Sequence, residues 1–524
     1  MSNLYTRLSR QFPSDAARPF AWLPDGDVLS YGDVEAASAR YANALRDRGV
    51  ATGDRVAVQV EKSIEMLMLY LGCLRAGAVF LPLNPAYTAG ELDYFIGDAQ
   101  PALIVCDPGA VAAIAALPAA AGIAIETLDA MRGGTLAELA LGASAAFDTV
   151  PREDDDLAAI LYTSGTTGRS KGAMLSHDNL ASNAFTLREA WRFTGEDVLL
   201  HALPIFHTHG LFVATNITLA SGASMIFLSR FDAGAVMAAL PRATVMMGVP
   251  TFYLRLLGEA GFDRELVSHM RLFVSGSAPL APDVHREFKA RTGHAILERY
   301  GMTETNMNTS NPYDGDRIPG TVGLPLPGVE IRIADSATGQ VLAQGEVGVI
   351  EIRGPNVFKG YWRMPEKTAS EFRGGFFISG DLGRIDARGY VSIVGREKDL
   401  IIAGGFNIYP AEVEDAIGEL EMVREVAVIG LPHGDLGEAV VAVVVPRDPG
   451  LADTGAIIGA LADRLARFKQ PRQVLFVEEL PKNAMGKVQK AALRERYAGL
   501  FGASNTRRRG GRHANDRAGR YAPR

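Results

Sequence analysis

The sequence predicts an α/β protein: a large N-terminal part of several subdomains, with parallel-type sheets packed by helices, and a small mobile α+β domain near the C-terminal end. Three observations predict it. Short apolar runs alternate with helix-like segments in the first half, glycine-punctuated β-like runs follow from about Gly345, and a compact mixed segment comes last. A chain of 524 residues with 48% hydrophobic and 22% charged residues is too long for one core, so we expect several domains.

The first half of the chain carries buried-strand patterns separated by helical ones. Helix-like patterns cover residues 31–49 and 63–77. Strands that are apolar on both faces and alternate with helices are typical of parallel sheets covered by helices. The expected strands lie in RVAVQV (55–60), ALIVCD (102–107), AAILYTSG (158–165), SMIFLS (224–229), ATVMMGVP (243–250) and MRLFVSGSAPL (270–280).

The second half predicts a β-rich subdomain and then a separate small domain. GEVGVIEIRG, GFFISGDLGRID and GYVSIVGREKDLII read as strands broken by glycine turns. The polar stretch 395–399 follows, and beyond it strand and helix patterns fill about a hundred residues. We therefore expect a large domain at 1–397, a small mobile domain at 398–501, and a tail at 502–524.

Composition limits the classes of function. The Arg-rich tail carries +6 of charge and the whole chain −7, which leaves −13 to the body and argues against a nucleic-acid-binding surface there. The tail lacks large apolar residues, which predicts that it is disordered. Cys73 and Cys106 each lie in an apolar run, which favours buried thiols in a reducing compartment. With no signal-peptide or membrane-spanning pattern, we expect a cytoplasmic protein that does not bind membranes.

The most specific local pattern is LYTSGTTGRSKGAMLSH (161–177). An apolar strand runs into a loop of glycines and four hydroxyl residues, followed by Lys171. Glycine lets backbone N–H groups approach an anion closely, and hydroxyls and a lysine complete a cradle for phosphate. The spacing differs from that of a Walker loop, which needs Gly-x-x-x-x-Gly-Lys followed by Ser or Thr.

This loop resembles the phosphate-binding signature of the adenylate-forming superfamily, which includes acyl-CoA synthetases, luciferases and the adenylation domains of peptide synthetases. YGMTE (300–304), SGDLGRID (379–386), GREKDLIIAGGFNIYPAEVE (395–414) and LPKNAMGKVQK (480–490) follow in the order of that family. The resemblance covers nearly the whole chain except the tail. It implies ATP and Mg²⁺ as cofactors and CoA as co-substrate, with an acyl-AMP intermediate.

The resemblance also implies roles for single residues. Tyr300 would stack on adenine, Thr303 would contact the phosphates, Glu304 and Thr166 would hold magnesium, and Asp381 would accept hydrogen bonds from the ribose. The nucleotide-binding residues implied in this way are Thr163, Ser164, Gly165, Thr166, Thr167, Gly168, Lys171, Ser277, Ala278, Glu298, Tyr300, Gly301, Met302, Asp381 and Arg396.

The expected catalytic set is completed by residues of two further motifs. Lys487 matches the mobile catalytic lysine of the family, and Lys398 matches the hinge about which the small domain turns. Gly404 and Gly405 would line the CoA channel, and His207 matches an aromatic gate between the acyl pocket and that channel. Thr303 and Glu304 are counted among the catalytic residues, and a lysine acetyltransferase and deacetylase acting on Lys487 are possible partners.

The acyl end of the expected pocket is polar. Thr208 and His209 replace the apolar residues common in relatives for fatty or aryl acids, and Arg299 stands where a small or apolar residue is common. A guanidinium there suits a second carboxylate, held by Arg299, Thr208 and Ser277. The alternative interpretation is an ion pair of Arg299 with a neighbouring acid.

Within the superfamily the pattern is similar to that of enzymes that activate malonate. We therefore expect an ATP-dependent ligase that converts malonate and CoA into malonyl-CoA through malonyl-AMP, releasing pyrophosphate and AMP. The alternatives are a synthetase for methylmalonate or another short acid, an adenylation domain that serves a carrier protein, and a non-catalytic nucleotide-binding scaffold.

Overall fold

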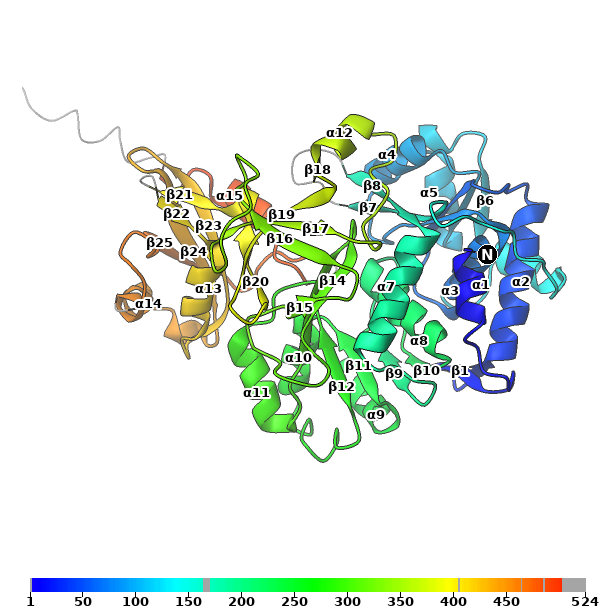
Figure 1. Ribbon diagram of the computed structural model, residues 1–524, viewed down its shortest axis with the longest axis horizontal. Coiled ribbons are helices and arrows are strands. Elements are labelled where there is room, and N and C mark those ends of the chain that lie inside the picture. The colour runs from blue at the N-terminus through cyan, green and yellow to red at the C-terminus, as the bar shows by residue number, and fades with distance from the viewer. Residues whose placement is uncertain (1, 164–169, 404–405, 463, 484–485, 502–524) are drawn as a thin grey trace, which may run out of the picture. The chain divides into compact units, whose positions relative to one another are not determined.

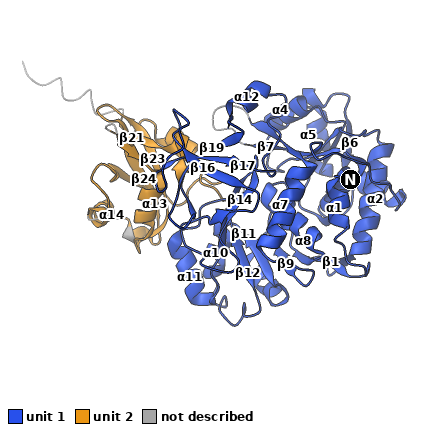
Figure 2. Cartoon of the chain, in the orientation of Figure 1, with its two compact units in different colours: residues 1–393 blue, residues 394–524 orange. Residues whose placement is uncertain are grey.

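The computed structural model describes residues 2–163, 170–403, 406–462, 464–483 and 486–501. The chain forms two compact units, residues 1–393 and 394–524, which are coloured separately in Figure 2. The division falls just before the predicted boundary at 397/398, so that Arg396 and Lys398 both belong to the second unit. The predicted tail at 502–524 lies outside the described residues.

The larger unit is α/β, as the sequence predicts (Figure 1). One of its sheets is parallel through β1, β10, β9, β11, β12 and β13, and antiparallel strands complete both ends. In sheet order its strands are β15 (Leu324–Pro325), β14 (Asn306–Ser310), β13 (Leu297–Met302), β12 (Leu272–Ser275), β11 (Val245–Gly248), β9 (Val198–His201), β10 (Ser224–Phe227), β1 (Pro19–Trp22) and β2 (Val28–Ser30).

A second sheet of this unit carries the beginning of the phosphate-loop pattern. Its strands are parallel except for the last pair, β7 and β8, which is antiparallel and flanks the loop. In sheet order they are β6 (Ala124–Thr127), β5 (Leu103–Cys106), β3 (Arg55–Gln59), β4 (Val79–Pro82), β7 (Leu157–Thr163) and β8 (Lys171–Ser176). The predicted strands therefore form, each within a few residues of its predicted position.

Helices cover these sheets, and their ends follow local chemistry. The Ser30 hydroxyl and the Asp33 carboxylate form a reciprocal capping box at the start of α2, and α3 ends at Gly77, whose φ of 72° suits glycine. The helices of this unit are α1 (Leu4–Ser9), α2 (Tyr31–Asp47), α3 (Ile64–Ala76), α4 (Ala89–Ala99), α5 (Val111–Ala115), α6 (Thr135–Gly142), α7 (His177–Ala190), α8 (Asn216–Ser221), α9 (Ala233–Ala239), α10 (Pro250–Leu257), α11 (Pro282–Thr292) and α12 (Pro365–Ser370).

The β-rich subdomain begins earlier than the sequence indicated. Its first strand is β16, which precedes Gly345 and pairs antiparallel with β17; its polar, partly exposed face hides the strand pattern from sequence reasoning. In sheet order the strands are β16 (Glu330–Ala334), β17 (Gly348–Arg353), β19 (Phe376–Ile385) and β18 (Phe372–Arg373), and β20 (Val391–Arg396) also pairs with β19.

The second unit is a small α+β domain. Its sheet contains β22 (Phe406–Ile408), β21 (Ile401–Ala403), β24 (Gly437–Pro446), β23 (Val423–His433) and β25 (Gln473–Phe476), and its helices are α13 (Pro410–Gly418), α14 (Thr454–Leu461) and α15 (Lys490–Tyr497). The long hairpin of β23 and β24 supplies both faces of the sheet, and each face packs on its own apolar cluster.

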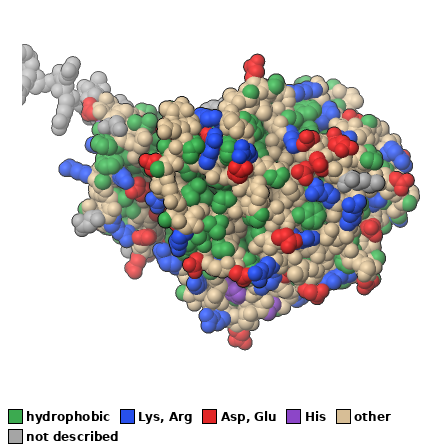
Figure 3. All heavy atoms as spheres, viewed as in Figure 1, with side chains coloured by type: hydrophobic (Ala, Val, Ile, Leu, Met, Phe, Trp, Pro, Cys, Tyr) green, Lys and Arg blue, Asp and Glu red, His purple; other side chains and the backbone are tan. Residues whose placement is uncertain are grey.

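Three observations relate to the predictions made from composition. No helix in the described part of the chain is long and apolar enough to cross a membrane. Figure 3 shows basic and acidic side chains interspersed on the visible face of the larger unit. Cys73 and Cys106 are buried free thiols, and burial raises the pKa of Cys106 to about 11, which leaves it protonated and unreactive at neutral pH.

Candidate active site

The phosphate-loop pattern is described only at its two ends. Ser164, Gly165, Thr166, Thr167 and Gly168 lie outside the described residues. Thr163 and Lys171 face each other as register partners on β7 and β8, and the Thr163 hydroxyl donates to the Lys171 carbonyl at 3.4 Å. The strand pairing therefore brings both ends of the predicted cradle to one point.

Lys171 and Glu304 are linked by a residue that the sequence analysis did not select, Tyr361. The Lys171 ammonium lies 4.1 Å from the centre of the Tyr361 ring and 3.5 Å from Oε1 of Glu371. The Tyr361 hydroxyl donates to Oε1 of buried Glu304 at 3.0 Å. Burial and the two carboxylates raise the pKa of Tyr361, so its hydroxyl stays a donor.

Tyr300 and Asp381 meet on the nucleotide side of the predicted site. Both are buried, and the Tyr300 hydroxyl donates to the Asp381 carboxylate at 2.6 Å. The Asp381 N–H donates to the Ser379 hydroxyl at 3.1 Å, and that hydroxyl donates to the Ile350 carbonyl at 2.7 Å. Strands β13 and β19, far apart in the sequence, thus place a ring and a carboxylate side by side.

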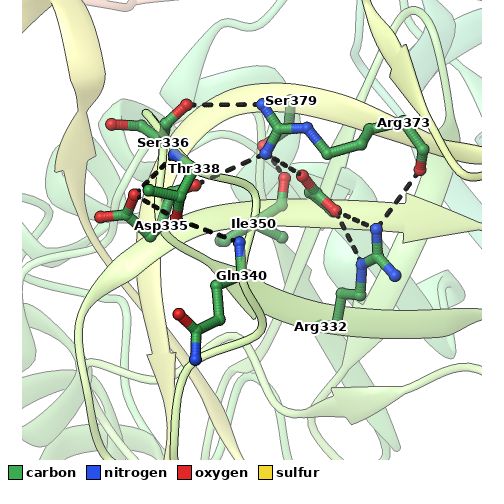
Figure 4. Close-up of polar contacts among 9 residues, drawn as sticks. Arg332, Asp335, Ser336, Thr338, Gln340, Ile350, Arg373 and Ser379 are labelled. Atoms are coloured by element: carbon green, nitrogen blue, oxygen red, sulfur yellow. Dashed lines mark hydrogen bonds and ion pairs between the residues drawn. The ribbon is translucent and has the colours of Figure 1, made fainter.

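An ion network around a buried glutamate involves β17, the neighbour in the sheet of the strand β19 that carries Asp381; Figure 4 shows its arginines Arg332 and Arg373. Glu351 on β17 is fully buried, and its carboxylate accepts from Arg332 Nε at 2.7 Å and from Arg373 Nη1 at 3.1 Å. A buried carboxylate without a cationic partner is strongly destabilising, and here two arginines share that role. The network therefore ties β17, which carries the Ile350 carbonyl that accepts from Ser379, to β16 and β18.

The turn after β13 gathers several predicted nucleotide-binding residues. Glu298 is buried on β13, while Met302 and Thr303 are half-buried at its end. Gly301 packs so closely that an added Cβ would lie 1.9 Å from the Asn306 carbonyl oxygen, which excludes any larger residue. The YGMTE motif therefore spans the end of β13 and the start of the tight turn that leads to β14.

The acyl end of the predicted site lies where a π-helix, His209–Thr215, follows β9. His207, just before it, is half-buried, and its Nδ1 accepts from the His209 N–H at 3.5 Å. The His209 ring is buried, with Nδ1 3.2 Å from the hydroxyl of Ser277, a residue held at a left-handed φ of 72° beside half-buried Ala278. Such a strained backbone conformation outside glycine is typical of functional sites.

Burial keeps His209 neutral. It lowers the pKa of His209 well below the ordinary value for histidine, and the positive charge of Arg299 lowers it further. In the described part of the chain, Nε2 of His209 and Oγ1 of Thr208 are both buried without a hydrogen-bond partner. A buried polar atom left unpaired costs about 1–3 kcal/mol, and a polar ligand that paired with these atoms would remove that cost.

Arg299 is the most unusual side chain of this cluster. It is 4% exposed, and among the described residues no acidic group pairs with it and its Nε and Nη2 have no hydrogen-bond partner. The guanidinium lies on Gly276, where an added Cβ would be 2.2 Å from Cζ. Burial lowers the pKa of Arg299 to about 9, partly opposed by Tyr253, so the group is a cation at neutral pH. Among the described residues, no acid pairs with Arg299 in the way that the alternative interpretation requires.

The predicted residues of the small unit are described separately. Lys487 is exposed in the loop before α15, and its N–H donates to Asn483 Oδ1 at 3.0 Å while its carbonyl accepts from the Asn483 N–H at 2.9 Å. Lys398 is exposed in a short 3₁₀ turn, Glu397–Asp399, directly after Arg396. Gly404 and Gly405 lie outside the described residues.

Comparisons with known proteins give consistent results. Residues 7–362 match the profile of the AMP-binding enzyme family and residues 412–487 that of the AMP-binding enzyme C-terminal domain. ATP-bound MatB from Rhodopseudomonas palustris superposes with a TM-score of 0.94 at 58% identity, over 95% of this chain and 99% of that one.

Two relatives are named for different acids. A feruloyl-CoA synthase from Amycolatopsis sp. is 36% identical over 90% of this chain and 94% of its own length. A malonate–CoA ligase from Arabidopsis thaliana is 33% identical over 92% of this chain and 87% of its own. The profile spans most of the larger unit, and the resemblance of the motifs to the adenylate-forming superfamily is thereby confirmed: the chain belongs to the AMP-binding enzyme family.

Proposed function

We propose that this protein is an ATP-dependent acid–thiol ligase that converts malonate and CoA into malonyl-CoA. The observation that carries the choice of acid is the buried guanidinium of Arg299, which lacks an acidic partner in the described part of the chain. A monocarboxylate joined to ATP at its only carboxylate leaves this cation unpaired. A dicarboxylate supplies the missing anion, which makes malonate the better fit.

The similarity to MatB and to the malonate–CoA ligase supports this choice, whereas the feruloyl-CoA synthase is named for an aryl acid. The cluster argues against an aryl acid here. Thr208, His209 and Arg299 present buried polar atoms, and an apolar ring against them would leave each one desolvated and unpaired.

The proposed reaction has two steps. One carboxylate oxygen of malonate attacks the α-phosphorus of ATP, and the bond to pyrophosphate breaks, which gives malonyl-AMP. The CoA sulfur then attacks the carbonyl carbon, AMP leaves, and the thiol proton is released. The first step brings anions together, so cations at the phosphates lower its barrier.

In this proposal the nucleotide is held by Tyr300 on β13 and by Asp381 on β19. The Tyr300 ring stacks on adenine and the Asp381 carboxylate accepts from the ribose hydroxyls, with Arg396 completing the contact. Lys171 pairs with the phosphates and gives up its present contact with Glu371. The Tyr300–Asp381 hydrogen bond supports this assignment because it orients the ring and the carboxylate together before ATP arrives.

Magnesium fits the donor set near Glu304. Its buried carboxylate offers a hard oxygen, and no group of three His, Cys, Asp or Glu side chains in the described part of the chain forms an all-protein metal cage. Mg²⁺ is commonly bound by one or two protein oxygens together with substrate phosphates and water, so Glu304 with Thr166 suffices. When bound, the ion would neutralise phosphate charge.

We expect Glu304→Gln to raise the Mg²⁺ concentration needed for half-maximal activity by roughly 10–100-fold, because an amide oxygen is a weaker ligand for a hard cation. The measurement is a Mg²⁺ titration of pyrophosphate release at saturating ATP. Tyr361→Phe is the control, since it removes the hydroxyl that contacts Glu304 but keeps the carboxylate. Equal Mg²⁺ requirements in the parent and in Glu304→Gln would contradict the assignment.

The small unit is proposed to serve both steps in turn. Lys487 contacts the α-phosphate and the carboxylate during adenylation, and a turn about Lys398 then brings Gly404 and Gly405 to the CoA channel, with His207 as the gate. Because Lys487 is exposed, a lysine acetyltransferase can reach it, and acetylation would remove the charge that adenylation needs.

A substrate panel tests the function as a whole. We expect malonate to exceed acetate, butyrate and benzoate in kcat/KM by at least about a hundredfold, because these leave the guanidinium unpaired. The kcat/KM for methylmalonate should be only roughly 10–200-fold below that for malonate, because discrimination against one methyl group is limited to about this range. Pyrophosphate release and CoA consumption are the measurements; a parent enzyme that uses butyrate as well as malonate, or a carrier protein in place of CoA, would refute the proposal.

A further inference from the structure

A buried lysine, Lys62, contacts the end of β9 and belongs to none of the sequence motifs described above. Lys62 follows β3 and is 9% exposed, and in the described part of the chain no acidic side chain forms an ion pair with it. Its ammonium lies 4.3 Å from the centre of the Phe227 ring. Burying a lysine without an acidic partner destabilises the fold, so stability alone does not explain why Lys62 lies there.

The two hydrogen-bonding contacts of Lys62 with described residues are both with His201, the last residue of β9. Nζ donates to the His201 carbonyl at 2.9 Å and lies 3.1 Å from Nδ1 of the same ring. Lys62 belongs to the loop after β3 in one sheet, and His201 ends a strand of the other. The pair therefore joins the carboxyl ends of β3 and β9, each a strand of a parallel part of its own sheet. α/β proteins commonly form their sites at the carboxyl ends of such strands.

These contacts fix which nitrogen of His201 carries the hydrogen. Nε2 lies 3.0 Å from the Gly210 carbonyl, which can only accept, and 3.3 Å from the Thr215 hydroxyl. The ring must therefore be protonated at Nε2, and its Nδ1 lone pair must face a donor, which is Lys62. The opposite tautomer would set N–H against ammonium and a lone pair against the carbonyl. Burial lowers the pKa of Lys62, and the side chain donates in either protonation state.

The Gly210 carbonyl in turn belongs to the first turn of the π-helix. The Thr215 hydroxyl donates to the same oxygen at 3.0 Å, so the two ends of the π-helix meet there. Gly210 also packs so tightly that an added Cβ would be 2.0 Å from the Pro204 carbonyl oxygen. The residue before it is His209, whose ring contacts Ser277, and Ser277 follows Gly276, on which the Arg299 guanidinium lies.

We propose that Lys62 is a positioning residue for the acyl site: it holds His201 in the one orientation that ties down the Gly210 carbonyl, and so sets the place of His209 beside Arg299. The inference rests on the proposed function for the identity of the acid, and it predicts that the pair controls recognition of the acid rather than of ATP. π-Helical turns are rare and are frequently found at functional sites, which agrees with a role of this turn in the acyl site.

The test compares Lys62→Met with Tyr70→Phe in the full-length enzyme. The control also removes a buried hydrogen bond next to the π-helix, from Tyr70 to Asn216 at 3.2 Å, but it leaves His201 untouched. We expect Lys62→Met to raise KM for the acid roughly tenfold, with KM for ATP changed by less than about threefold, and Tyr70→Phe to leave both nearly unchanged. Equal effects of the two variants would make Lys62 an ordinary core residue.

A second pair of variants separates the two sides of His201. The amide nitrogen of Gln takes the place of Nε2, so His201→Gln keeps a donor to Gly210, whereas Asn takes the place of Nδ1 and keeps only the contact with Lys62. We expect His201→Gln to retain most of the affinity for the acid and His201→Asn to behave like Lys62→Met. In a His209→Ala background the Lys62→Met effect should vanish; persistence of the full effect would overturn the proposal.

NMR of the full chain with ¹⁵N-labelled histidines completes the test independently of the substrate. We expect the His201 ring to be protonated at Nε2 in the parent, and the Nδ1 resonance to shift in Lys62→Met, because that lone pair loses its hydrogen-bond donor. Kinetics use whichever acid the parent converts best. A parent inactive on malonate would therefore overturn the proposed function alone, whereas an unchanged His201 signal in Lys62→Met would overturn the role of Lys62.

Discussion

Arg299→Ala is expected to lower kcat/KM for malonate by roughly a hundred- to a few thousand-fold. The distal carboxylate of malonate loses its partner in a desolvated site, which costs about 3–5 kcal/mol by analogy with broken buried ion pairs, at about 1.4 kcal/mol per factor of ten. The ratio of kcat/KM for malonate to kcat/KM for butyrate should fall at the same time. Initial rates of pyrophosphate release with both acids, in the parent and in the variant, measure this.

Three further variants separate recognition from structure. Arg299→Lys keeps the charge without the planar fork and should recover only part of the activity. Arg299→Met keeps the volume and should not lower the melting temperature of the free enzyme, because among the described residues the guanidinium has no acid to lose. Gly276→Ala leaves Arg299 in the chain but places a Cβ where the guanidinium lies, so it should also weaken malonate use.

The outcomes that would contradict this prediction are equally specific. A malonate efficiency within about threefold of the parent in Arg299→Ala would exclude a contact with the substrate. A fall of several degrees in the melting temperature of Arg299→Met, together with equal losses for malonate and butyrate, would make Arg299 a structural residue. Either result would remove the argument for a dicarboxylate and leave the family assignment intact.

Lys487→Ala is expected to abolish adenylation almost completely while CoA transfer from supplied malonyl-AMP continues. The lysine is proposed to contact the α-phosphate only in the first step. Its positive charge there reduces the repulsion between the malonate carboxylate and the phosphates. The two half-reactions are measured separately, as pyrophosphate release and as malonyl-CoA formation from the synthetic adenylate.

The matched control is Lys482→Ala, which removes a lysine of the same loop that pairs with Glu425 at 2.7 Å. It should leave both half-reactions close to those of the parent, because a partly exposed ion pair contributes little. Equal loss of the two half-reactions in Lys487→Ala would refute a role confined to adenylation. Enzymatic acetylation of Lys487 should reproduce the loss, and deacetylation should restore the activity.

Much of the fold and of the site could be predicted because it is encoded locally. Periodicity of apolar residues predicted β3, β5, β7, β10, β11 and β12 to within a few residues, since buried strands and amphipathic helices differ in spacing. The order of five motifs predicted the family, which the profile over residues 7–362 confirms. The strand β16 was missed because its exposed polar positions carry little of this signal.

The sequence by itself determined the class of protein, the α/β order of its elements and the residue types of its nucleotide motifs, because these depend on neighbours along the chain. Only the tertiary structure decided which of these groups are paired. It joined Tyr361 to Glu304, set Lys62 against His201, and left Arg299 buried without an acid in the described part of the chain. Burial and pairing depend on strands that meet across the sheets, and no pattern along the chain encodes that meeting.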